Sequence, residues 1–224
     1  MMSNPLSEQQ QAMIPIAAFT AKGDMVALGT ALHHGLDVGM TINGIKEILV
    51  QLYAYAGFPR SLNALSAFMT VLAQRQQRGL TDEVGREASS NPEPWDALVE
   101  GTRNQTRLVG QPVTGALFAF APAIDGFLKS HLFGDIFQRD VLDWQTRELA
   151  TIGALAAMAG VNNQLKSHLA MSLNTGWTVA QLRGYVSTLK ASCGDEMGRN
   201  AEAVLNELLA SQQTGDAGSG EEKR

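Results

Sequence analysis

The stretch from Asp143 to Thr178, DWQTRELATIGALAAMAGVNNQLKSHLAMSLNTGWT, contains the pattern that decides the fold class. Apolar residues recur in it every three or four positions, the spacing that places side chains on one face of an α-helix. These residues are Leu149, Ile152, Leu155, Ala159, Leu165, Leu169 and Leu173. No part of the chain alternates apolar and polar residues over the length of a strand. We therefore predict an all-α protein.

Residues that cap helices mark the ends of the helices in this stretch. Asp143 stands at the start of the first helix, and Gly176 ends the second. Thr178 then begins a further helix with Gln181 three residues later, which is the spacing of a capping box. The stretch therefore predicts three successive helices with well-defined turns.

The chain also matches itself when it is shifted by 137 residues without a gap. The identities fall mainly on turn glycines and apolar positions, where a shared backbone restricts the side chain most. They include Gly39 with Gly176, Thr41 with Thr178, Gly23 with Gly160, Leu28 with Leu165, Leu32 with Leu169, and Gly57 with Gly194. A chance alignment of Ala- and Leu-rich helices is the alternative, but an ungapped match through three turns disfavours it. We predict two copies of one helical-hairpin unit.

The predicted organisation has four parts: a first helical repeat at 1–76, a connecting segment at 77–142, a second repeat at 143–212, and a tail at 213–224. The connecting segment begins with a polar loop, and an amphipathic helix over 95–108 follows this loop. Five of the eight phenylalanines lie between 118 and 137, and we expect a helix there that packs between the repeats. The tail is Gly-rich and charged, so we expect it to be disordered.

Composition excludes several classes of protein. A chain of 224 residues that is 45% hydrophobic, with a net charge of −5, is long and apolar enough to fold. With 17 Lys and Arg against 22 Asp and Glu, it has no excess of cations for a nucleic acid. No apolar run is long enough to cross a bilayer, and the N-terminus lacks the basic start of a secretory signal. We expect a cytoplasmic protein that binds neither nucleic acid nor membrane.

Glu148 and His168 do not lie on the solvent-facing sides of their predicted helices, where polar residues are expected. Glu148 lies at the edge of the apolar face of its helix, and His168 stands on the core-facing side of the next helix. At the offset of 137, the first repeat has Gln11 and Ala31 instead, so only the second repeat carries the two ionisable groups. A carboxylate beside an imidazole gives an acid–base pair. The alternative is a core histidine that is paired with a glutamate and has no catalytic role.

Four further residues are candidates for holding a substrate: Tyr53, Tyr55, Arg60 and His131. The two tyrosines are two positions apart, so at most one of them points into a given pocket. Arg60 is suited to an anionic carboxylate, although a surface arginine is the simpler interpretation. The spacing of the remaining histidines does not fit a metal site, and we expect no metal and no cofactor.

Several motifs resemble the carboxymuconolactone decarboxylase family, which has the alkylhydroperoxidase-like fold. In the second repeat they are Arg147-Glu-Leu149, Gln164-Leu-Lys-Ser-His168 and Asn174-Thr-Gly-Trp-Thr178. In the first repeat they are Gly39-Met-Thr41, Ile45-Lys-Glu-Ile48 and Tyr53-Ala-Tyr-Ala-Gly-Phe-Pro59, and Phe133-Gly-Asp-Ile-Phe137 with Arg139 precedes the second. The resemblance covers both repeats and implies an all-α protein that assembles into trimers or hexamers.

The resemblance implies one of two chemistries. One branch of the family uses a CxxC motif just ahead of the histidine, but this chain has Val161 and Gln164 there and Cys193 as its single cysteine, so peroxidase chemistry is rejected. The other branch is a cofactor-free decarboxylase of aromatic-acid degradation, and Glu148 and His168 match its acid–base positions. The sequence thus predicts a lyase acting on a small carboxylated lactone or related acid. The alternative is a non-catalytic protein that binds small molecules or serves assembly on the same fold.

Overall fold

The computed structural model describes residues 5–218, and it describes side chains as far as residue 213. Every regular element in this range is helical, which confirms the predicted all-α class. The first part of the chain forms α1 (Glu8–Lys22), α2 (Met25–Asp37), α3 (Ile42–Gln51), α4 (Tyr53–Ala56) and α5 (Phe58–Gln77). The last part forms α9 (Trp144–Ala156), α10 (Asn162–Asn174), α11 (Val179–Cys193) and α12 (Asp195–Gly218).

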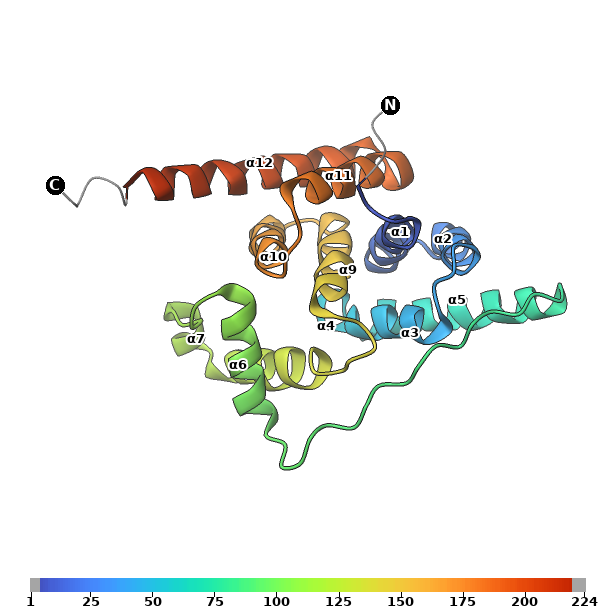
Figure 1. Cartoon of the computed structure of the whole chain (residues 1–224), viewed down its shortest axis with the longest axis horizontal. Coiled ribbons are helices and arrows are strands. Elements are labelled where there is room, and N and C mark those ends of the chain that lie inside the picture. Colours follow the sequence, from blue (N-terminus) through green and yellow to red (C-terminus); the bar gives the residue numbers. More distant parts are fainter. Residues whose placement is uncertain (1–4, 219–224) are drawn as a thin grey trace.

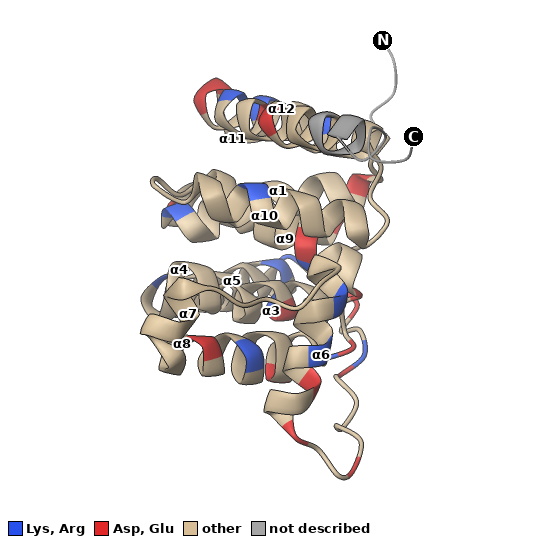
Figure 2. Cartoon of the chain, turned by 90° about the vertical axis from the view of Figure 1, so that its left-hand side faces the viewer, with Lys and Arg blue, Asp and Glu red and all other residues tan. Residues whose placement is uncertain are grey.

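The helices lie in layers (Figures 1 and 2). Helices α11 and α12 cover one end of the molecule, and the hairpins α1–α2 and α9–α10 lie beneath them. Helices α1 and α9 pack against each other at the centre, where a Cβ on Gly153 would lie 3.2 Å from the Cβ of Ala17. One continuous hydrophobic core joins the two hairpins.

The predicted helix ends are confirmed. The carboxylate of Asp143 accepts a hydrogen bond from the amide of Thr146 at 2.7 Å, and Thr178 forms a capping box with Gln181. Gly176 has a φ of +105°, in the left-handed region that favours glycine. The last helix, α12, extends to Gly218, so residues 213–218 of the predicted tail are helical and residues 219–224 lie outside the described range.

The connecting segment differs in part from the prediction. The amphipathic helix is present as α6 (Ala97–Val109), but the Phe-rich segment is divided into α7 (Ala116–Phe120), α8 (Pro122–Phe127) and the π-helix η1 (Leu128–Ile136). Pro122 prevents a single helix because the residue before a proline, Ala121, is driven out of the helical conformation. The segment packs mainly on α6, and the small core that they form also includes Met171 of α10, with Tyr53, Tyr55 and Trp144 packed against it.

The crossing of α6 and η1 is made possible by two glycines. A Cβ on Gly101 would overlap the carbonyl group of Lys129, and a Cβ on Gly134 would overlap the carbonyl oxygen of Ala97. The two backbones are therefore in direct contact, and α6 and η1 form one compact body at the lower left of Figure 1.

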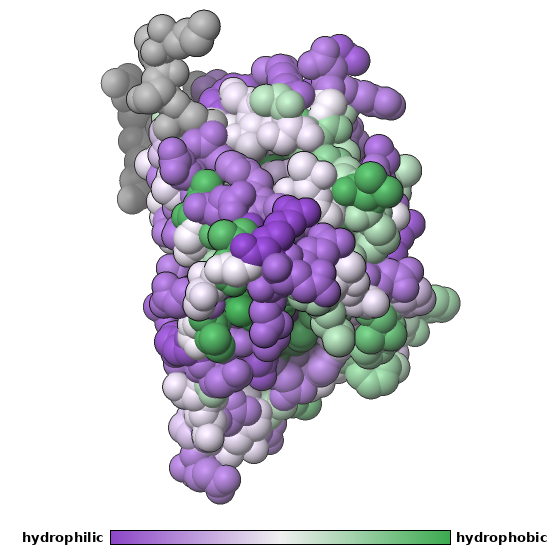
Figure 3. Space-filling model, turned by 90° about the vertical axis from the view of Figure 1, so that its right-hand side faces the viewer, coloured by the Kyte–Doolittle hydropathy of each residue, from purple (hydrophilic) through white to green (hydrophobic). Residues whose placement is uncertain are grey.

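Exposed apolar residues are unevenly distributed. On the face shown in Figure 3, hydrophobic residues are scattered among hydrophilic ones. By contrast, α7 and α8 expose Leu117, Phe120, Ile124 and Phe127 close together in the chain. No helix within residues 5–218 is both long and apolar enough to cross a membrane.

Replacing Gly101 with Ala should lower the free energy of unfolding by about 3 kcal/mol, at the upper end of overpacking effects, because backbone atoms must move to admit the methyl group. Gly29→Ala is the matched control, since this helical glycine has no atom within 4 Å of the added Cβ. It should stabilise the protein by about 0.5–1 kcal/mol. Urea unfolding of both variants measures the difference, and equal effects at the two positions would contradict the close crossing.

Candidate functional site

The structure brings Glu148 and His168 together. A turn at Gly160, with a φ of +78°, folds α10 back along α9 and places the two side chains face to face. The Nδ1 atom of His168 lies 2.7 Å from Oε2 of Glu148. Glu148 is fully buried, and the His168 side chain is 9% exposed. The imidazole is thus held by a carboxylate through one nitrogen, which leaves Nε2 available to a bound molecule.

Tyr55, from the first part of the chain, completes this cluster. Its ring stands edge-on to the His168 ring, with centroids 5.4 Å apart and planes at 81°. The Tyr55 hydroxyl is buried, and neither it nor Oε1 of Glu148 has a hydrogen-bond partner within the described part of the chain. Burial raises the pKa of Tyr55 far above its ordinary value, and the nearby Glu148 carboxylate raises it further. The hydroxyl is therefore a proton donor at every physiological pH.

A cavity of about 700 Å³ opens onto His168 and Tyr55. Its volume lies in the range of small-molecule sites. Helices α6, α7, α8 and η1 form one wall, and α10 with the end of α9 forms the other. Most of the lining is apolar, including Leu128, Leu132, Phe133, Leu155, Met158 and Met171. The lining polar groups other than Tyr55 and His168 are Gln105, Gln111, Gln164, Ser167 and Asn174.

Behind the pair, a buried polar network centres on Arg147, whose side chain is completely inaccessible to solvent. Its guanidinium donates to Oε1 of Glu47 and to Oε1 of Gln51, each at 2.8 Å. Glu47 also accepts two hydrogen bonds from Arg139. The amide of Gln51 donates in turn to the hydroxyl of Thr151 at 2.8 Å. The network therefore ties α3 to α9 immediately beside Glu148.

The charges of this network shift one another's pKa values. Burial by itself raises the pKa of Glu47, but hydrogen bonds from Arg139 and Arg147 outweigh it and hold the pKa below its ordinary value. For Arg147, burial is the largest effect and lowers the pKa, although the Glu47 carboxylate opposes it. Glu47 is thus the counter-ion that allows a charged arginine in the core.

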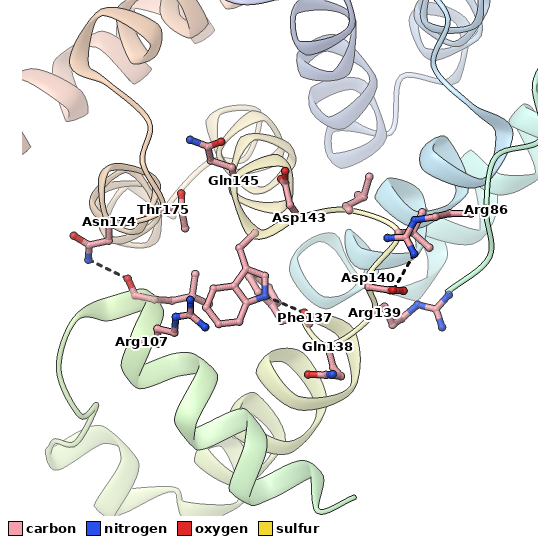
Figure 4. A pocket seen from close by; sticks show the side chains of 14 residues that line it. Arg86, Arg107, Phe137, Gln138, Arg139, Asp140, Asp143, Gln145, Asn174 and Thr175 are labelled. Atoms are coloured by element: carbon pink, nitrogen blue, oxygen red, sulfur yellow. Dashed lines mark hydrogen bonds and ion pairs between the residues drawn. The ribbon is translucent and has the colours of Figure 1, made fainter. Parts of the chain in front are cut away.

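A second cavity, of about 750 Å³, lies on the other side of α6 and has a different character (Figure 4). Arg86, Arg107 and Arg139 all line it. The guanidinium of Arg107 lies over the indole of Trp144, 5.0 Å from the ring centroid, and Arg86 pairs with Asp140 at 2.8 Å. Asn174 lines both cavities and donates to the carbonyl oxygens of Leu108 and Val109, at the end of α6. These three arginines therefore line a cavity that His168 does not line.

Of the four residues predicted to hold a substrate, only Tyr55 lines the His168 cavity. Tyr53 stacks instead on Phe58, with centroids 4.2 Å apart, because residues two apart on a helix face different directions. His131 is exposed and lies 2.9 Å from Asp135, its neighbour one turn later. Arg60 is exposed near the Gly23 turn. These three residues therefore do not line the His168 cavity in the folded chain, and their role in holding a substrate stays a prediction.

No pattern in the sequence indicated the network around Arg147. Charged residues in helices are usually solvated, and Glu47 is separated from Arg147 by 100 positions, so no local pattern links them. Gln105, buried in the cavity wall, was also missed because a glutamine in an amphipathic helix carries no signal of its orientation. No group of three or more potential metal ligands is found in the described residues.

Replacing Glu47 with Gln should lower the free energy of unfolding by about 3–5 kcal/mol, because the buried Arg147 loses its counter-ion. The pKa of Glu47 is lower in the folded chain, so its contribution is complete above the ordinary value of 4.5 and is lost as the pH falls towards the folded-state pKa. Wild type should therefore lose more stability than Glu47→Gln when urea unfolding is repeated from roughly pH 7 down to roughly pH 3. Glu202→Gln, which removes an exposed pair with Lys190, should change little. If Glu47→Gln and Glu202→Gln lowered the free energy of unfolding by similar amounts, the role of Glu47 as counter-ion would be contradicted.

Comparison with known proteins identifies a family to which part of the chain is similar. No curated protein matches the chain. Residues 122–207 match the carboxymuconolactone decarboxylase family. The match runs from α8 into α12 and includes both Glu148 and His168, whereas Tyr55 and Glu47 lie outside it. Residues 122–207 are therefore a domain of the carboxymuconolactone decarboxylase family.

Proposed function

We propose that this protein is a cofactor-free lyase of the carboxymuconolactone decarboxylase type, which acts on a small acid or lactone by general acid–base catalysis. The observation that carries the proposal is the buried contact of 2.7 Å between Glu148 and His168 at the wall of the 700 Å³ cavity. The family match of residues 122–207 supports it, because both residues fall within that segment. A buried acid–base pair that faces a cavity is a characteristic arrangement of active sites.

The chemistry follows from the positions of three groups. In a decarboxylation, the bond between the carboxylate carbon and the adjacent carbon breaks, CO2 leaves, and the electron pair moves into a conjugated carbonyl group. The Tyr55 ring covers one side of His168, and its buried hydroxyl stays neutral close to the Glu148 carboxylate. A proton from Nε2 of His168 then restores the C–H bond, while Glu148 stabilises the imidazolium through Nδ1.

We also propose that 1–76 and 143–212 are copies of one unit. Helices α2 and α10 begin 137 residues apart, as do α3 and α11, and α5 and α12. The matching turn glycines have similar positive φ angles, such as +79° at Gly23 and +78° at Gly160. In this arrangement the second unit supplies the acid–base pair, and the first supplies Tyr55 and Glu47. The two copies of the unit thus contribute different residues to one site.

His168→Gln should reduce CO2 release from carboxylated lactones by at least about 100-fold, because glutamine cannot transfer the proton. The assay follows CO2 release over a panel of lactone acids, using carboxymuconolactone first. His34→Gln is the matched control, since this histidine is exposed in the first unit and should retain full activity. Retained turnover in His168→Gln would refute the proposal. Specific binding of a lactone acid without turnover by the wild type would support a binding protein instead.

Tyr55→Phe keeps the ring against His168 and removes only the buried hydroxyl, so kcat and KM should each change by less than about threefold. Steady-state kinetics on the best substrate of the panel measures both constants. Because the hydroxyl lies close to Thr151 and to the Glu148 carboxylate, its loss should lower the free energy of unfolding by at most about 1 kcal/mol. A fall in kcat of about tenfold or more would instead assign the hydroxyl a part in the reaction.

A further inference from the structure

We propose that Gln105 donates a hydrogen bond to a carbonyl or carboxylate oxygen of the substrate in the His168 cavity, and so fixes how the substrate lies against His168. The inference deepens the proposed function and rests on it, because it names a further residue of the same site and the chemical group that this residue binds. Gln105 belongs to α6 and lies outside residues 122–207, so the family match does not assign it.

The side chain of Gln105 is buried but unpaired. The residue is 5% exposed and lines the cavity. Within the described part of the chain, no group forms a hydrogen bond with its side-chain amide. A ligand that filled the cavity with apolar atoms alone would leave this amide desolvated and unpaired, at a cost of about 1–3 kcal/mol. A ligand with an acceptor oxygen at this point avoids that cost, so the wall favours such an oxygen.

The neighbouring residue, Asn104, carries an amide with a structural role. Asn104 is 9% exposed, and its side chain donates to the carbonyl oxygen of Phe133 at 2.9 Å. This hydrogen bond joins α6 to η1. Gln105 makes no such bond to η1 among the described residues, although the two elements pack closely. The amide of Asn104 thus serves the fold, whereas that of Gln105 is available to a ligand.

The place of Gln105 on α6 is fixed by residues on the same face of the helix. Gly101, one turn earlier, lies against the backbone of η1, and Leu108, one turn later, belongs to the same small core as Met171 of α10. His168 lies on the opposite wall of the cavity, on α10. A substrate between the two walls is therefore contacted by an amide on one side and by the imidazole on the other.

This arrangement suits a decarboxylation. The electron pair left by CO2 moves into a conjugated carbonyl group, while the proton from His168 goes to a carbon atom elsewhere in the molecule. A neutral donor at the carbonyl oxygen stabilises the negative charge that develops there. If the oxygen belongs instead to a carboxylate that does not react, the same amide holds it equally in the ground state and in the transition state. Both roles need the same donor and the same kind of acceptor.

The test measures the binding of two unreactive probes to the full chain by calorimetric titration. One probe is a saturated five-membered lactone that carries a carboxymethyl group, and the other is the cyclic ether that lacks only the lactone carbonyl. Gln105→Met keeps the length of the side chain and removes the donor, so the lactone should bind about tenfold more weakly. If the ether keeps its affinity, Gln105 binds the carbonyl group. If both probes weaken equally, it binds the carboxylate.

Urea unfolding separates this role from a structural one. Gln105→Met should not lower the free energy of unfolding, because the amide that it removes has no partner among the described residues. Asn104→Leu is the matched control on the same helix, and it should lower the free energy of unfolding by about 1–3 kcal/mol, because the carbonyl group of Phe133 loses its donor. Gln76→Met, at an exposed residue of α5 that does not line the cavity, should leave the binding of both probes unchanged.

Binding of both probes by Gln105→Met within about threefold of the wild type would overturn the proposal. So would a failure of both probes to bind the wild type at roughly 10 mM, or a loss of stability in Gln105→Met as large as that in Asn104→Leu. Because the probes do not react, the outcome is independent of the chemistry at His168. Weaker probe binding by Gln105→Met together with an active His168→Gln variant would refute the proposed function and leave the role of Gln105 standing.

Discussion

A fully buried guanidinium, that of Arg147, is the constraint on which the site depends. A charge in the core is tolerated only when a counter-ion and hydrogen-bond acceptors surround it, and here Glu47 and Gln51 of α3 provide them. Helix α3 must therefore pack against α9 at one register. That register also fixes the side chain next to Arg147, which is Glu148, and through it the imidazole of His168. The electrostatic requirement of one arginine thus determines the geometry of the pair beside the cavity.

The same packing explains why the site needs both ends of the chain. Tyr55 follows α3 directly, so the network that docks α3 on α9 also presents the Tyr55 ring to His168. The family domain at 122–207 contains the acid–base pair but not these partners. A fragment limited to that domain would expose Arg147 and lose the residue that covers His168. The described site is consequently a property of the whole fold rather than of the matched segment.

Sequence patterns predicted the helices, their caps and the meeting of Glu148 with His168, because these follow from local periodicity and from turn glycines such as Gly160. They could not predict the position of Arg60 or His131, since the direction of an exposed side chain depends on how distant helices pack. The Phe-rich segment was misjudged for a related reason. Its composition indicated burial correctly for Phe133 and Phe137, but Pro122 divided it, and it packs on α6 as well as on Met171 of α10.

The glycine crossing of α6 and η1 has a consequence for how the cavity is encoded. Because the two backbones touch at Gly101 and Gly134, the crossing of α6 and η1 is set by contacts between these two elements, and Met171 of α10 packs against the same cluster. Helices α6 and η1 supply Gln105, Leu132 and Phe133 to the cavity, whereas the His168 imidazole comes from the hairpin α9–α10. Much of the wall of the cavity and the imidazole that faces it are therefore encoded in separate stretches of the chain.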